Sequence, residues 1–257
     1  MKGVLILTEG RSGSTWLGTL ANSTGVLGQS AEWLDRLRRE PAMRRLDGPA
    51  HAAEVVARGA GDGSFFSVKL FPRHLFRFHR RYGLDFVQHV AERHDVRLVR
   101  LTRRDRLAQA ISYARAMQTR QWTSRKDTPR NEPVYDFERI CRSYMLIQRS
   151  YTFWESYGTL RGLPAREFVY EDLLASPLPW LEHIAEHAGV AELPPLQTDL
   201  SIQRSATTEA WRARFLDDAA RAGLTDLAQD ARPRSRTPLN LARFLAGREM
   251  KPYAYSY

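Results

Sequence analysis

The sequence is poor in cysteine and has no long apolar run near its N-terminus. Its 257 residues contain one cysteine, Cys141, which excludes an intrachain disulfide, and no Cys/His spacing resembles a zinc site. After Lys2, the apolar run of residues 4–7 is interrupted by Thr8 and Glu9, so it is too short for a signal peptide or a membrane span. We therefore expect a cytoplasmic protein without a structural metal.

Lysine is also scarce, so arginine carries nearly all of the positive charge. Lys and Arg together number 39 against 29 Asp and Glu, a net charge of +10, and only four of these cations are lysines: Lys2, Lys69, Lys126 and Lys251. A positive field favours nucleic acid, anionic lipid or a polyanionic small ligand. Solvated surface arginines give the same composition. The charge thus allows an anionic ligand without requiring one.

Short apolar segments alternate along the chain with segments of helical period. Residues 4–8, 65–70, 96–101 and 168–170 read as strands. Residues 15–21 read as a helix, and apolar residues recur at helical spacing in three further segments: Leu107 to Met117, Phe137 to Tyr151 and Trp180 to Ala188. This alternation predicts an α/β fold of three layers, a parallel β-sheet flanked by helices, with ligands at the carboxyl ends of the strands.

A turn of small residues stands between the first predicted strand and the first predicted helix. Gly10 and Gly13, with Ser12, Ser14 and Thr15, bring backbone N–H groups and a helix N-terminus to one point, which is a phosphate-binding arrangement. The nucleoside triphosphatase loop G-x-x-x-x-G-K-[ST] is excluded, because no lysine precedes Ser14 or Thr15. The dinucleotide fingerprint fails as well, because its third glycine is missing.

The string G-R-S-G-S-T-W, from Gly10 to Trp16, resembles the 5'-phosphosulfate loop of sulfotransferases, commonly P-K-S-G-T-T-W, with Arg11 in place of the lysine. The resemblance implies a P-loop-like sulfotransferase fold. It also implies 3'-phosphoadenosine-5'-phosphosulfate (PAPS) as donor and the desulfated nucleotide (PAP) as product. In this interpretation Arg11 neutralises the bridging oxygen, residues 12–15 bind the 5'-phosphate, and Trp16 belongs to the cofactor-binding set.

The segment TRRDRLAQAISYARAMQTRQW, residues 102–122, is similar to the bacterial trehalose 2-sulfotransferase family. That resemblance favours Arg103, nine residues before Ser112, as its partner in holding the 3'-phosphate of the donor. Arg104 fits the eight-residue spacing of the animal enzymes and remains an alternative. An arginine fork matches the oxygens of a phosphate, and a serine hydroxyl adds a short hydrogen bond.

The segment STGVLGQSAEWL, residues 23–34, resembles the same family's pattern T-G-x-x-G-x-x-x-E-[FW] and carries its catalytic glutamate onto Glu32. A carboxylate at this point can take the proton of the attacking hydroxyl. Lys69 in FFSVKL matches a K-L in the family's corresponding strand, and we assign it to the sulfuryl group or the acceptor side. The alternative is an edge-strand lysine whose ammonium reaches solvent.

Residues 200–215 resemble, more loosely, a segment whose arginine closes over the donor, which makes Gln203 and Arg204 candidate cofactor-binding residues. The polar segment 118–133 is a candidate lid. We interpret Tyr170, Glu171 and Asp172 as structural. Residues 1–218 are predicted to form the sulfotransferase domain, and residues 219–257 a C-terminal extension packed on it or extending from it.

The resemblance predicts an enzyme that transfers a sulfuryl group from PAPS to a hydroxyl of a carbohydrate, glycolipid or related metabolite, with no metal and no nucleic-acid partner. The family's members can be dimers, so a homodimer is compatible with it. Two other functions stay open. One is an atypical P-loop phosphotransferase or kinase, which needs magnesium and acidic ligands. The other is a basic nucleic-acid-binding protein, although no recognised module of that kind is present.

Overall fold

The computed structural model describes residues 1–122, 131–199, 206–222 and 238–245, and within them it has a four-stranded parallel sheet of order β2-β1-β3-β4. The strands are β1 (Lys2–Leu7), β2 (Phe65–Leu70), β3 (Asp95–Thr102) and β4 (Ala165–Val169). The predicted α/β fold is confirmed. The bounds predicted for the fourth strand were wrong: β4 is an edge strand whose Arg166 and Glu167 are exposed, so its first residues lack the apolar pattern.

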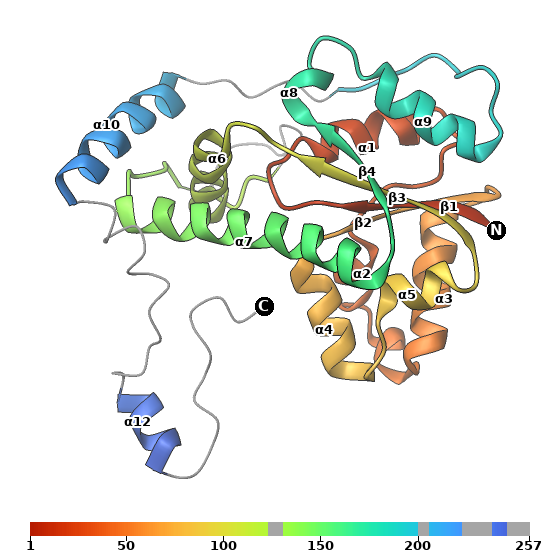
Figure 1. Cartoon of the computed structure of the whole chain (residues 1–257), viewed down its shortest axis with the longest axis horizontal. Coiled ribbons are helices and arrows are strands. Elements are labelled where there is room, and N and C mark those ends of the chain that lie inside the picture. Colours follow the sequence, from red (N-terminus) through yellow and green to blue (C-terminus); the bar gives the residue numbers. More distant parts are fainter. Residues whose placement is uncertain (123–130, 200–205, 223–237, 246–257) are drawn as a thin grey trace.

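Helices lie on both faces of the sheet, with α1 and α9 on one side and α3, α4 and α5 on the other (Figure 1). The helices described are α1 (Ser14–Ser23), α2 (Trp33–Leu37), the 3₁₀ helix η1 (Pro41–Arg45), α3 (Gly48–Ala60), α4 (Pro72–Tyr82), α5 (Phe86–Ala91), α6 (Arg106–Thr119), α7 (Phe137–Arg161), α8 (Tyr170–Leu173), α9 (Leu178–Ala188), α10 (Ala206–Ala222) and α12 (Pro238–Leu245). None of these is both long and apolar enough to cross a membrane.

Strand β1 is buried on both faces because it lies between β2 and β3. Successive side chains of a strand point to opposite faces, so an unbroken apolar run supplies two cores at once. Leu5 and Leu7 join the core beneath α3, α4 and α5, whereas Val4 and Ile6 join the core beneath α1 and α9. Burial on both faces fixes the position of the loop that follows Leu7.

A third core joins α6, α7 and α10, with Ile111, Ile147, Trp211 and Phe215 among its members. Met117, which we placed on the apolar face of its helix, is 48% exposed in the last turn of α6, so that assignment was wrong. Helix α10 runs unbroken through residues 218 and 219, where we placed a domain boundary; the boundary itself stays a prediction.

Candidate active site

The loop after β1 presents the uncapped N-terminus of α1 at the carboxyl edge of the sheet. Gly13 is the N-cap residue, with φ of 89°, and a Cβ atom there would lie 2.2 Å from the ring of Tyr170. No side chain of the described residues caps α1, and its first turn holds no acid. The first N–H groups of a helix lack partners within it and carry partial positive charge. This arrangement suits an anion such as a phosphate.

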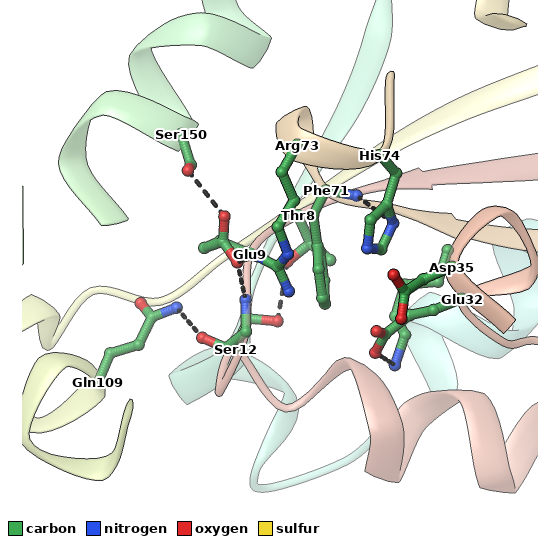
Figure 2. Close-up of polar contacts among 12 residues, drawn as sticks. Thr8, Glu9, Ser12, Glu32, Asp35, Phe71, Arg73, His74, Gln109 and Ser150 are labelled. Carbon is green, nitrogen blue, oxygen red and sulfur yellow. Dashed lines mark hydrogen bonds and ion pairs between the residues drawn. The ribbon is translucent and has the colours of Figure 1, made fainter. Parts of the chain in front are cut away.

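Several polar groups of the loop are hydrogen-bonded to other groups of the protein (Figure 2). The N–H of Gly10 donates to the carboxylate of Glu9 at 2.7 Å, and the carbonyl of Gly10 accepts from the amide of Gln109 at 2.9 Å. The hydroxyls of Ser12 and Thr8 are hydrogen-bonded at 2.8 Å, and Ser12 is fully buried. Gly10 and Ser12 therefore hold the loop in shape; their predicted contact with a donor stays a prediction.

Three arginines gather on the side of the loop that faces α6. Arg11 has φ of 66°, its Nε donates to the hydroxyl of Ser112 at 2.8 Å, and its guanidinium also donates to the carbonyl of Trp122. Arg103 donates to the carbonyl of Arg11 at 3.3 Å. Burial, followed by the charges of Arg103 and Arg115, lowers the pKa of Arg11 to about 10. A polyanion relieves such repulsion between buried like charges.

Of the two arginines at the end of β3, the structure brings Arg103 to this cluster and not Arg104. Arg103 is four-fifths buried and contacts the same Arg11 that binds Ser112. Arg104 is exposed and pairs with Asp172 at 2.7 Å. The geometry therefore favours the nine-residue spacing over the eight-residue spacing.

Glu32 and Lys69 lie together beside the loop of residues 10–15, which we call the phosphate loop. Ala31 forms a parallel bridge with Val68, and the N–H of Lys69 donates to Ala31 at 2.9 Å, which places Glu32 next to β2. The ammonium of Lys69 lies 3.1 Å from a carboxylate oxygen of Glu32 and donates to the hydroxyl of Thr15 at 3.2 Å. Lys69 is 5% exposed. It is thus a buried link between the loop and Glu32 rather than an edge-strand lysine that reaches solvent.

The surroundings of Glu32 keep it ionised. Burial raises the pKa of Glu32, but neighbouring groups, the ammonium of Lys69 foremost, outweigh that effect, so the pKa lies below its ordinary value of 4.5. His74 is buried nearby, and burial, followed by the charge of Arg73, lowers its pKa to about 3. His74 is therefore neutral at physiological pH, and its Nδ1 accepts from the N–H of Phe71 at 3.3 Å.

A buried pair, Glu9 and Arg73, lies behind the loop and was not predicted from the sequence. The carboxylate of Glu9 is fully buried, accepts from Arg73 at 2.5 Å and from the hydroxyl of Ser150 at 2.8 Å (Figure 2). We read Glu9 only as an interruption of an apolar run. An acid placed directly between a buried strand and a loop glycine was the signal available, because a buried carboxylate requires a partner.

Other predicted residues are placed less directly. The ring of Trp16 meets that of Tyr170 edge-on, with centroids 6.3 Å apart. Glu171 accepts from the backbone N–H groups of Arg104 and Asp105 and lies 3.6 Å from Arg103. Gln203, Arg204 and residues 123–130 of the candidate lid lie outside the described residues. Within the residues that are described, no three metal-binding side chains cluster.

The comparisons with known proteins give one result. A family model described as Stf0 sulphotransferase matches residues 83–218, which is more than half of the 257 residues. The matched stretch contains Arg103 and Ser112, whereas the phosphate loop, Glu32 and Lys69 precede it. No curated protein matches the chain.

Proposed function

The chain belongs to the Stf0 sulphotransferase family, and from that premise we propose that it transfers a sulfuryl group from PAPS to a hydroxyl of a carbohydrate, glycolipid or related metabolite. The observation that carries the proposal is the position of Lys69, which contacts both Thr15 of the phosphate loop and Glu32. A donor phosphate at the N-terminus of α1 and an acceptor hydroxyl at Glu32 would then face each other across one short gap.

The donor has two phosphate positions in this proposal. The 5'-phosphate binds the N–H groups of the first turn of α1, with Ser14 and Thr15. The 3'-phosphate binds Arg103 and Ser112. The backbone of Arg11 belongs to the loop, but its guanidinium donates to Ser112. This contact supports a position for Arg11 beside the 3'-phosphate instead of at the bridging oxygen, which we first assigned to it.

The reaction proposed is an in-line transfer. The oxygen of the acceptor hydroxyl forms a bond to sulfur while the bond from sulfur to the 5'-phosphate oxygen breaks, and the electron pair of that bond leaves with PAP. The proton of the hydroxyl passes to Glu32, whose carboxylate is ionised at neutral pH. Catalysis then depends on positioning and on cations placed where negative charge develops.

Incubation with labelled PAPS and a panel of extracted metabolites, followed by mass detection of sulfated products, tests the proposal. Calorimetry with PAP tests the donor site without an acceptor. We expect Arg103→Ala to weaken PAP binding strongly and Arg104→Ala, the matched control beside it, to leave binding near that of the wild type. A protein that binds no PAP, or that transfers only phosphoryl groups and stops when magnesium is chelated, would contradict the proposal.

A further inference from the structure

Arg73 is a cation in the first turn of a helix, where its charge is unfavourable. It is the second residue of α4, three residues after β2 ends at Leu70. The positive end of a helix dipole repels a cation unless an anion is close by. The anion is Glu9, which accepts from Arg73 at 2.5 Å and is fully buried. Burial lowers the pKa of Arg73, but neighbouring groups, Glu9 foremost, outweigh this effect and raise the pKa, so Arg73 stays charged.

Glu9 binds the guanidinium of Arg73 and is itself fixed by further hydrogen bonds. Its second oxygen accepts from Ser150 at 2.8 Å, and its first oxygen also accepts from the N–H of Gly10 at 2.7 Å. The ring of Phe71 supports the guanidinium from the side, with Cζ 4.3 Å from the ring centroid. Because α7, the phosphate loop and Phe71 all contact this pair, the guanidinium has a fixed position and direction.

The guanidinium of Arg73 is partly exposed and is not fully hydrogen-bonded. Among the described residues, Glu9 is its only hydrogen-bond partner, and the side chain is 20% exposed. A guanidinium has five N–H donors, so several of them remain for a ligand. Lys69 lies on the same Phe71 ring, 5.8 Å from its centroid, and Figure 2 shows Arg73 on the side of Phe71 toward Glu9, with Glu32 on the other side.

We propose that Arg73 is a catalytic residue that donates hydrogen bonds to the sulfuryl oxygens during transfer, an inference that rests on the proposed function. In that function the sulfuryl group passes from the phosphate loop to an acceptor at Glu32. Arg73 lies close enough to Glu32 to lower its pKa, and it shares the Phe71 ring with Lys69. Arg11, the loop cation, is directed to Ser112 instead. As the bond from sulfur to the 5'-phosphate breaks and the bond to the acceptor oxygen forms, negative charge on the sulfuryl oxygens meets a preorganised cation.

The variant Arg73→Met tests this role, with Arg77→Met as the control one turn along α4, where the arginine is exposed and pairs with Asp35 at 3.2 Å. PAPS turnover is followed as PAP release, with water or the identified acceptor as nucleophile. We expect Arg73→Met to lose about 10²–10³-fold in turnover, the usual effect of removing one oxyanion donor, and Arg77→Met to stay near wild type. Calorimetry should show unchanged PAP affinity and a lost preference for PAPS over PAP.

Because Arg73→Met leaves the carboxylate of Glu9 buried without its cation, the double variant Glu9→Gln/Arg73→Met is measured as well. It removes both charges, and its thermal melting reports whether the fold is kept. The inference is overturned if a folded Arg73 variant turns over PAPS at the wild-type rate, or if its PAP affinity falls in step with turnover. A wild-type protein that neither binds PAP nor consumes PAPS overturns the proposed function instead.

Discussion

Glu32 has a lowered pKa, which makes it a weak base that is always in the basic form at neutral pH. Neighbouring groups, Lys69 foremost, produce this state against the effect of burial. In the proposed role of general base, such a carboxylate takes its proton late, when the acceptor oxygen has already lost charge to sulfur. Rate then depends less on the pKa of Glu32 than on its position.

The variant Glu32→Gln keeps the shape of the side chain and removes its basicity. We expect turnover to fall by about 10²–10⁴-fold, the usual contribution of a general base, while PAP affinity stays unchanged. Steady-state kinetics with PAPS and calorimetry with PAP check the two halves of this expectation. Unchanged turnover would remove Glu32 from the role of base.

The variant Lys69→Met removes the ammonium that lies 3.1 Å from Glu32. The carboxylate then loses its main stabilising charge, so the pKa of Glu32 rises toward or above 4.5. Activity that requires the carboxylate is lost as pH falls through this pKa, so the acidic limb of the pH–rate profile moves to higher pH. The matched control is Lys2→Met, the same substitution at an exposed lysine. An unmoved limb in Lys69→Met would show that Lys69 does not tune Glu32.

At this scale the sequence predicted members of the site more readily than their contacts. Glu32 and Lys69 were each identified, but their ion pair was not, because a pattern along the chain does not report which strands become neighbours. The pair Glu9 and Arg73 was missed for the same reason. The two residues come from different elements, and only the adjacency of β1 and β2 brings them together.

At the scale of elements, the loop that enters α1 depends on the left-handed backbone of Gly13 and on the close approach of Gly13 to the ring of Tyr170. Gly13 has φ of 89° and lies against the ring of Tyr170, whereas Gly25 has φ of 70° with nothing within 4 Å of a Cβ. Both glycines adopt the left-handed region, which costs other residues about 1–2 kcal/mol. Only Gly13 also has a neighbour that an added methyl group would displace.

We therefore expect Gly13→Ala to destabilise the protein by more than the matched control Gly25→Ala, which should cost about 1–2 kcal/mol. Gly13→Ala should also weaken PAP binding, because Tyr170 or the loop must move to admit the methyl group. Thermal unfolding and calorimetry measure the two effects. Equal melting temperatures for the two variants would show that the contact with Tyr170 carries no cost.

The four strands and helices α1, α6, α7 and α9 were predicted from the sequence, because buried strands and amphipathic helices have distinct periods, whereas α3, α4, α5 and α10 were not predicted. Three strands, β1, β2 and β3, begin and end within about two residues of their predicted bounds. Strand β4 was displaced because Arg166 and Glu167 face solvent at the edge of the sheet. The order β2-β1-β3-β4 was not predictable, because it follows from packing between distant segments.

At the scale of the whole molecule, the net charge is +10, and burial, followed by the charges of Arg103 and Arg115, lowers the pKa of Arg11 in the free protein. Ligand binding to the folded state stabilises it by about 2.7 kcal/mol at 100 times Kd. For a chain of this size that is about 5–10 °C in Tm. We expect PAP to produce this shift, adenosine 5'-phosphate to produce a smaller one, and Arg103→Ala to remove the difference between them. Equal shifts with both nucleotides would contradict a 3'-phosphate site at Arg103.

The central place of β1 also affects how the protein is made. Its two neighbours, β2 and β3, both follow it in the chain. At about 5–20 residues per second, a ribosome needs on the order of 5–20 seconds to deliver the second of them. Until then Val4, Leu5, Ile6 and Leu7 have at most β2 to pair with, and one edge of β1 stays unpaired. The loop after β1 is thus synthesised before β2 and β3 and takes its place in the sheet only after them.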